Sequence, residues 1–448
     1  MSNAAKPRLS RRILYPIQTF IQAEAFSGIL LVFIALLALI WANSAWADTY
    51  EATWGTTFTV AIGDFSLSKD LLHWINDGLM TIFFFVVTME IKREFLLGEF
   101  ASFRKASFPI MAAIGGMVVP ALIFVLFNAG EAGISGWGIP MATDVAFALG
   151  LLSLLGKRVS LALKLFLVAC AMVDDIGAVL VIALFYTADV NFLSLWVAFG
   201  IFGLLLVISS FNVRALPVYI LLGLVMWVAF LLSGVHATVA GILLALTIPS
   251  RSGIKQDEFI FSTDHILGEL HAAHFSPHLS GAAVAEEERE GDFQAAAYTI
   301  AANSEKALSP LSRLERALHP WAAFAIMPLF ALANAGIFVD AALLDNFFNP
   351  LAVGIVLGLT LGKPLGIIVF AGLASAAGFA IKPDSISWWQ VIGVGLLSGI
   401  GFTMSIFIAN LAFEGTGLLP AAKLAILAAS GMAAAGGLLL LLLARSVD

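Results

Sequence analysis

Long apolar stretches separated by short polar segments run along the whole chain. Each stretch spans about 18–25 residues, which suits an α-helix crossing a hydrocarbon core roughly 30 Å thick and is too long for a barrel strand. We therefore expect an all-α membrane protein with about twelve transmembrane helices. Their expected centres lie near residues 35, 84, 117, 146, 174, 202, 225, 242, 328, 361, 401 and 432.

The basic residues favour one orientation of these helices. Four of them precede the first span, which places the N-terminus in the cytoplasm by the positive-inside rule. Of the 23 Lys and Arg residues, all but Lys69, Lys423 and the intramembrane Lys363 then fall on the inner side. We expect both termini in the cytoplasm, and we expect the first span to be a retained helix instead of a cleaved signal.

The composition excludes a soluble globule. Hydrophobic residues make up 60% of the 448 positions, charged residues only 12%, and the mean hydropathy is +0.99. The net charge of −7 says nothing about partners, and the sequence suggests no nucleic-acid partner. The single cysteine, Cys170, excludes an intramolecular disulfide and suits a packing role.

Two adjacent carboxylates, Asp174 and Asp175, lie near the middle of an apolar run at residues 160–187. A charged side chain at the centre of a spanning helix costs about 2.5–3.5 kcal/mol on insertion scales, so this pair is expected to handle ions or protons. The other ionisable residues within or near spans are Asp77, Glu90, Asp144, Lys363, His236 and His319. Structural alternatives remain for these: Asp144 and Lys363 can offset helix dipoles, and the rest can snorkel, cap or pack.

Two spans contain helix-breaking residues at matching places. Gly136, Gly138 and Pro140 precede Asp144, and the span near residue 401 contains four glycines, Gly393, Gly395, Gly399 and Gly401. Non-helical backbone at membrane depth is tolerated only where it lines protein or a wet cavity, so the two breaks predict one buried polar site. Each interrupted helix is the second helix of a three-helix unit, at residues 107–187 and 350–444. This arrangement predicts that the two units are inverted repeats whose breaks cross at the midplane of the membrane.

Two connections are longer than turns. Residues 48–69 contain alternating apolar and polar positions on both sides of Gly63 and Asp64, which predicts a small extracytoplasmic β-hairpin. A lone hairpin is marginally stable, so we expect it to pair with a second copy in a homodimer.

Residues 251–312 form a polar insert, expected as a flexible cytoplasmic loop with a short helix or two. Its four histidines match no defined metal site, which favours a solvated loop over a metal-binding or pH-sensing one. They are His265, His271, His274 and His278.

Eight segments, taken in order, closely resemble the bacterial NhaA sodium/proton antiporters. They are WINDGLM at 74–80, EIKRE at 90–94, ATDVAFALG at 142–150, DDIGA at 174–178, SGVHAT at 233–238, LHPW at 318–321, GKPLG at 362–366 and GIGFTMSIF at 399–407. The resemblance covers roughly residues 15–250 and 309–445. It implies a pH-regulated and electrogenic secondary transporter of the bacterial inner membrane that exchanges Na⁺ or Li⁺ for H⁺.

The resemblance also implies roles for single residues. Asp174 and Asp175 would form the cation and proton site with Asp144 and Thr143 nearby, and Lys363 would pair with Asp174. A pH-responsive inner funnel would lie near Glu90, Glu315 and His319, while His236, on the other side of the membrane, would influence the pH profile. Arg316 departs from the family pattern, which has histidine there, and the 251–312 insert is longer than that pattern leads us to expect.

This chemistry needs neither a cofactor nor an enzymatic step. Na⁺ and Li⁺ prefer oxygen ligands, and a site that holds either protons or one cation couples the two flows by competition. Lys363 could itself release a proton on cation binding or only hold the broken helices together.

An intramembrane aspartyl protease is disfavoured because the nearest Gly-x-Gly-Asp-like string, residues 61–64, lies in a loop. The absence of a Walker-type phosphate loop argues against a primary pump, and saturable exchange would distinguish a carrier from a channel.

Overall fold

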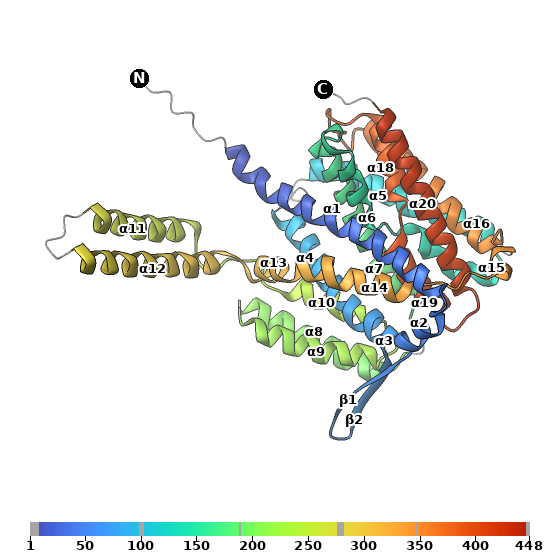
Figure 1. The fold of residues 1–448 in the computed structure, drawn as a ribbon, viewed down its shortest axis with the longest axis horizontal. Coiled ribbons are helices and arrows are strands. Elements are labelled where there is room, and N and C mark those ends of the chain that lie inside the picture. Colours follow the sequence, from blue (N-terminus) through green and yellow to red (C-terminus); the bar gives the residue numbers. More distant parts are fainter. Residues whose placement is uncertain (1–8, 98–102, 188–189, 276–281, 346, 445–448) are drawn as a thin grey trace.

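The computed structural model describes residues 9–97, 103–187, 190–275, 282–345 and 347–444, and these form a bundle of helices with two projections (Figure 1). Seven helices are long and apolar enough to cross a membrane. They are α3–η1–α4 (Leu71–His73, Trp74–Leu79, Met80–Leu97), α5 (Phe103–Asn128), α7 (Leu161–Phe185), α8 (Phe192–Ser210), α13–η5–α14 (Pro310–Trp321, Ala322–Ile326, Met327–Asn334), α16–η6–α17 (Pro350–Leu357, Gly358–Gly362, Lys363–Ala376) and α20 (Leu419–Leu443).

Three bent pairs and two shorter helices occupy the remaining expected positions. The first pair joins α1 (Leu9–Ala42) to α2 (Ala47–Trp54) at 113°. The second joins η3 (Ala132–Met141) to α6 (Val145–Leu154) at 46°, and the third joins α18 (Trp388–Ser398) to α19 (Phe402–Phe413) at 44°. The shorter apolar helices are α9 (Leu216–Leu231) and α10 (Thr238–Thr247). The two interruptions expected from glycine and proline are thus confirmed.

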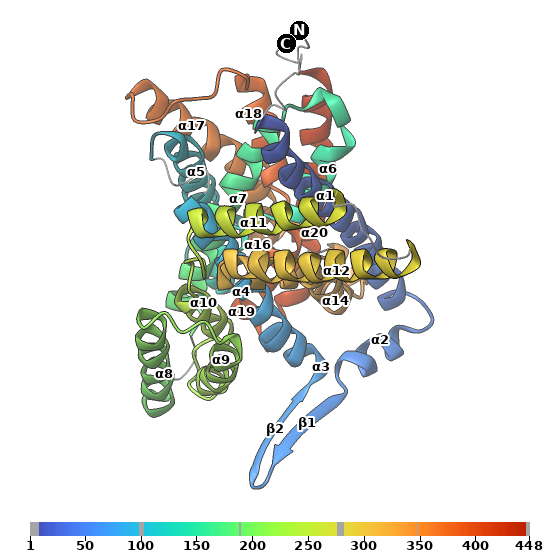
Figure 2. The ribbon, with the colours of Figure 1, turned by 90° about the vertical axis from the view of Figure 1, so that its left-hand side faces the viewer.

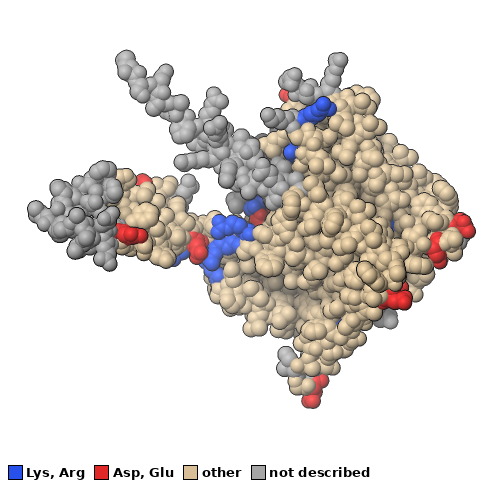
Figure 3. All heavy atoms as spheres, in the orientation of Figure 1, with Lys and Arg blue, Asp and Glu red and all other residues tan. Residues whose placement is uncertain are grey.

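The bundle has two main hydrophobic cores within its described residues. The larger contains side chains of α1, α5–α7 and α16–α20, including Phe124, Leu167 and Phe407. The smaller lies among α4, α8, α9, α10 and α13, around Met89 and Tyr219. Charged side chains are sparse on the body of the molecule and gather toward its edges and projections (Figure 3), as expected for a surface that faces lipid.

The predicted hairpin is confirmed, with a helix before it that the sequence analysis did not expect. Strands β1 (Thr57–Ile62) and β2 (Phe65–Asp70) pair antiparallel, with Thr57 opposite Asp70 and Ile62 opposite Phe65. Gly63 has φ +59° at the first turn position, which a type II′ turn requires and glycine adopts without strain. Residues 47–54, within or beside the segment expected as hairpin, form α2 instead.

The polar insert forms two helices that are longer than expected. α11 (Gln256–Phe275) and α12 (Ala282–Ala307) lie side by side as an arm that projects from the bundle (Figures 1 and 2). Alanine and glutamate dominate α12 and both favour helix, which explains its length. The side chain of His274 and all of His278 lie outside what the structure describes, as do the basic residues Lys6 and Arg8. The remaining elements are the short helices η4 (Gly156–Arg158) and α15 (Ala341–Asp345).

Helices α5 and α17 approach each other closely at a pair of glycines. A Cβ atom added at Gly366 would lie 2.0 Å from the Gly115 carbonyl oxygen, and one added at Gly115 would lie 2.1 Å from that of Gly366. Neither position can therefore carry a side chain without moving a helix. This contact fixes the position of α17, whose first residue is Lys363.

We predict that Gly366→Ala lowers stability by about 1–3 kcal/mol through overpacking. Gly372→Ala, on the same helix, is the matched control, because its new Cβ would meet only Trp388 at 4.0 Å. That variant should be neutral or slightly stabilising, since alanine favours helix more than glycine does. Thermal unfolding of the purified variants in detergent measures both, and equal midpoints for the two would contradict the prediction.

Candidate ion-binding site

The breaks of the two interrupted helices meet in the larger core. The backbone N–H of Asp144 donates to the carbonyl of Ile400 at 2.7 Å, and the hydroxyl of Thr143 lies 2.9 Å from the carbonyl oxygen of Ser398. Backbone groups that helical hydrogen bonding leaves unpaired at one break are therefore satisfied by the other. The crossing also brings together residues more than 250 positions apart in the chain.

Asp144 joins the N-termini of two helices at this crossing. Its Oδ1 accepts a hydrogen bond from the N–H of Phe147 at 3.0 Å, which makes it the N-cap of α6. Its Oδ2 accepts from the hydroxyl of Thr403 and from the Thr403 N–H at 3.3 Å, at the start of α19. A carboxylate is favoured there because both helix ends carry partial positive charge.

Asp174 and Lys363 form a buried ion pair beside the breaks. The ammonium of Lys363 donates to Asp174 Oδ2 and, at 2.8 Å, to the hydroxyl of Thr143, which lies 2.7 Å from the same carboxylate oxygen. Both charged residues are fully or almost fully buried. Asp174 Oδ1 has no hydrogen-bond partner among the described residues, so this carboxylate retains one unused acceptor.

A local break in α-helical pairing precedes Lys363. Residues 358–362 form a turn of π-helix, and Pro364, which has no N–H, follows the lysine. Such turns are frequent at functional sites, and proline removes one backbone donor from the helix. The sequence analysis did not predict this irregularity, although the GKPLG segment marks its place.

Asp175 faces a small cavity instead of the ion pair. The cavity has a volume of about 60 Å³, which exceeds the roughly 10–15 Å³ that one water requires. Its oxygen-bearing lining residues are Thr143, Asp144, Asp175 and Glu90. Within the described part of the chain, no hydrogen bond or ion pair to the Asp175 carboxylate is present. The cavity thus offers oxygen ligands of the kind that hard cations prefer.

The predicted funnel residues lie at one end of this cavity. His319 Nε2 is 3.4 Å from Glu90 Oε1, and both residues line the cavity. Next to them, Arg93 contacts Glu315 at 2.5 Å and Glu94 at 3.1 Å. Exposure rises from 5% at Asp175 to 12% and 17% for the side chains of Glu90 and His319. The cavity is therefore more accessible at the Glu90 end.

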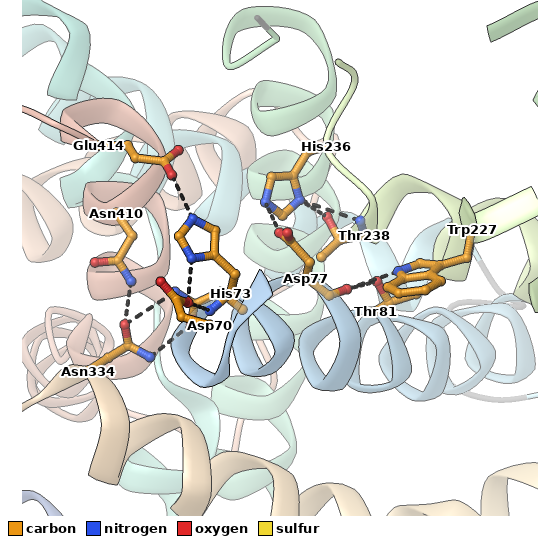
Figure 4. A network of polar contacts seen from close by, with 11 residues as sticks. Asp70, His73, Asp77, Thr81, Trp227, His236, Thr238, Asn334, Asn410 and Glu414 are labelled. Atoms are coloured by element: carbon orange, nitrogen blue, oxygen red, sulfur yellow. Dashed lines mark hydrogen bonds and ion pairs between the residues drawn. The ribbon is translucent and has the colours of Figure 1, made fainter. Parts of the chain in front are cut away.

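Asp77 and His236 form a separate pair (Figure 4). Asp77 lies on the α3–η1–α4 span that also carries Glu90, but toward the opposite end of that span. His236 Nε2 lies 3.4 Å from Asp77 Oδ1, and its Nδ1 lies 2.7 Å from the hydroxyl of Thr238. The indole of Trp227 donates to the Asp77 carbonyl at 3.1 Å. Neither Asp77 nor His236 lines the cavity at Asp175. The structure therefore divides the predicted residues into a central group and this distal pair.

Sequence reasoning missed several partners in the site. Thr403 enters the sequence analysis only within the segment at 399–407, yet it binds Asp144 through its hydroxyl and its N–H. Arg93 enters it only within the segment at 90–94, yet its guanidinium contacts Glu315. In the described residues, no group of three or more His, Cys, Asp or Glu side chains converges as a metal site. A cation here would therefore depend on hydroxyl, backbone or water oxygens in addition to carboxylates.

Comparisons with known proteins give a consistent result. The family model described as Na⁺/H⁺ antiporter 1 matches residues 18–441. A protein of Oleidesulfovibrio alaskensis, named Na⁺/H⁺ antiporter NhaA, is 49% identical over 439 residues, which cover 98% of this chain and 96% of the relative. Proteins with the same name from Wolinella succinogenes and Helicobacter pylori are 46% and 45% identical, covering 93% and 92% of this chain and 91% and 92% of the relatives.

We predict that Lys363→Met lowers stability by about 3 kcal/mol near neutral pH, because it leaves Asp174 buried without its cation. Asp174→Asn in the same chain should restore most of the loss, since the remaining pair of side chains is then uncharged. Thermal unfolding in detergent measures the effect, and Lys69→Met on the exposed strand β2 serves as the control. A Lys363→Met protein as stable as the unmodified chain would contradict this interpretation.

Proposed function

The chain belongs to the NhaA family of Na⁺/H⁺ antiporters, and from this membership we propose that it exchanges Na⁺ or Li⁺ for H⁺ at Asp174 and Asp175. The observation that carries the assignment is the Asp175 carboxylate, which faces a small cavity with further oxygen atoms and has no hydrogen-bond partner in the described residues. The same carboxylate can hold a proton or contribute to a cation site. Thr143 and Asp144 would supply further oxygens.

Competition for these carboxylates would couple the two flows. A cation entering the cavity favours the ionised form of Asp175, while protonation removes the charge that holds the cation. Asp174 is engaged by Lys363 in this structure, so a cation that also binds Asp174 must displace the ammonium. The free acceptor on Asp174 Oδ1 supports this role, because it gives the cation an oxygen to approach first.

We propose alternating access as the transport mechanism, with residues 107–187 and 350–444 as inverted repeats around the crossing. Support comes from the position of the cavity, which α4 and α13 border on one side and α6, α7 and α19 on the other. A shift between these two groups of helices would open or close the cavity. Cations would enter at the Glu90 end, where exposure is greatest.

Further properties belong to the same proposal. We expect an inner-membrane protein with both termini in the cytoplasm and the hairpin outside, as the distribution of basic residues favours. Exchange is expected to be electrogenic, because two acidic groups and one lysine can together release more than one proton per cation. Cysteine cross-linking at Thr59 tests the expected homodimer through β1 and β2.

We predict that Asp175→Ala abolishes Na⁺- and Li⁺-dependent proton movement in proteoliposomes, because the other carboxylates that line the cavity, Asp144 and Glu90, are engaged by Thr403 and His319. Asp384→Asn, which changes an exposed carboxylate, is the control and should exchange normally. Exchange near the unmodified rate in Asp175→Ala would refute the site. Single-channel currents in the unmodified protein would instead identify a channel.

Regulation by pH is proposed for the group at the cavity's accessible end. A protonated His319 pairs with Glu90 and adds positive charge where cations would enter. We predict that His319→Gln raises the exchange rate at acidic pH several-fold relative to the rate at alkaline pH, when the pH is varied on the inner side of the membrane. Proteoliposome assays over a pH series measure this profile, with His271→Gln in the exposed arm as the control. An unchanged profile would remove His319 from the regulatory group.

A further inference from the structure

A second group of charged residues lies at the other end of the second span from the cavity (Figure 4). His73 is the last residue of α3, Asp70 ends strand β2, and Glu414 directly follows α19. The His73 ring lies between the two carboxylates. Its Nδ1 is 2.5 Å from Asp70 Oδ1, and its Nε2 is 3.2 Å from Glu414 Oε1. The ring thus connects the base of the hairpin to the end of α19.

Both contacts can be satisfied only when the ring is protonated. A neutral imidazole has one N–H donor and one acceptor nitrogen, whereas an ionised carboxylate only accepts hydrogen bonds. Two carboxylates on one ring therefore require the imidazolium, which donates from both nitrogens. Loss of the proton leaves one carboxylate facing a lone pair, so one of the two contacts must break.

The groups around His73 cannot replace the proton of the ring as a hydrogen-bond donor to both carboxylates. Asp70, Asp77 and Glu414 are the carboxylates that act on the ring, and Lys69 lies near it on β2. Asp77 has its own partner, His236. Partial burial raises the pKa of Asp70, but hydrogen bonds from the His73 backbone and side chain outweigh it and hold that pKa below its ordinary value. Asp70 therefore stays ionised while the ring titrates.

An uncharged contact lies beside the charged one. Asn410 on α19 donates to Asn334 Oδ1 at 2.6 Å, and Asn334 donates to Asn76 Oδ1 at 2.9 Å. These amides join η1, on the same span as His73, to α19 through α14, and they do not titrate. This amide contact therefore stays unchanged when a proton binds or leaves His73.

The two helices joined by His73 both reach the cavity. Glu90 on α4 lies 17 residues along the span from His73, or about 25 Å away at the helical rise. Thr403, which binds Asp144, lies 11 residues before Glu414, or about 17 Å along α19. Phe83, Glu90 and Met404 from these helices line the cavity. A change in their relative position at one end would therefore alter the cavity at the other.

We propose that His73, Asp70 and Glu414 form a proton-dependent clasp that holds α4 and α19 together at the hairpin side and opens when that side becomes alkaline. The proposal rests on alternating access, because only a cycle that moves these helices makes the clasp matter. It applies to the hairpin side, in contrast to the pH response assigned to Glu90 and His319. The clasp would slow exchange when the outer pH is low.

The first test is a double-variant cycle in purified protein. At acidic pH, His73→Gln and Glu414→Gln should each lower the melting temperature, and the double variant should lower it no further. The side chains of His73 and Glu414 are 37% and 70% exposed, so the coupling should change the unfolding equilibrium only about two- to fivefold. At alkaline pH the coupling should vanish. Additive effects at acidic pH, or equal coupling at both pH values, would overturn the clasp.

The second test is transport in vesicles of known orientation, with pH varied only on the hairpin side. His73→Gln and Glu414→Gln should raise exchange at acidic outer pH about two- to fivefold and leave the alkaline rate unchanged. His73→Lys keeps a cation at every pH and should hold exchange low as the outer pH rises. His265→Gln, in the exposed arm, should behave as the unmodified protein.

The two tests separate this proposal from the transport function. If the unmodified protein exchanges ions and the His73 and Glu414 variants share its outer pH profile, the clasp is wrong and the function stands. If the unmodified protein exchanges no ions, the proposed function fails. In that case the link between the clasp and transport is rejected. The double-variant cycle then tests only whether the contact between His73 and Glu414 depends on protonation.

Discussion

The structure depends on the neutralisation of buried charge where two interrupted helices cross. A helix break inside a membrane exposes backbone dipoles that lipid cannot satisfy. Here the two breaks bond to each other, Asp144 compensates the N-termini of α6 and α19, and Lys363 compensates Asp174. Each charge is tolerated because its opposite lies within hydrogen-bond distance. The close packing of α5 against α17 at Gly115 and Gly366 holds α17, and therefore Lys363, in the position that this ion pair requires.

One carboxylate is left out of this compensation, and the proposed exchange depends on that difference. Asp174 and Asp144 are engaged by protein groups, whereas Asp175 faces a cavity. A buried carboxylate without a protein partner is stabilised by whatever small cation or proton reaches it. Neighbouring residues in one helix thus differ in role because the helix turns them toward different surroundings. The ion pair engages Asp174, while the carboxylate of Asp175 faces the cavity.

The second span connects the ends of the molecule. One end of this span carries Glu90 and the Arg93–Glu315 pair, and its hairpin end carries His73 and Asp77. Histidine and carboxylate are paired at both ends, so protons on either side of the membrane can act on the same helix. Glu90, near one end of this span, itself lines the cavity, whereas His73 and Asp77 lie at the other end, away from it. The π-helical turn at 74–79 adds one irregularity to that helix.

The sequence by itself determined the membrane class, the position of nearly every span, the two helix breaks and the hairpin, and it predicts the acidic residues of the proposed site. These follow from local rules: hydrophobic length, the helix-breaking chemistry of glycine and proline, and the cost of charge in lipid. It did not determine the length of the α11–α12 arm, the helix before the hairpin, or the π-helical turn at Lys363. Only the tertiary structure decided that Thr403 binds Asp144, that Arg93 holds Glu315, and that His73 meets Glu414. Such contacts join residues hundreds of positions apart, and no local pattern encodes which distant side chain will satisfy a buried charge.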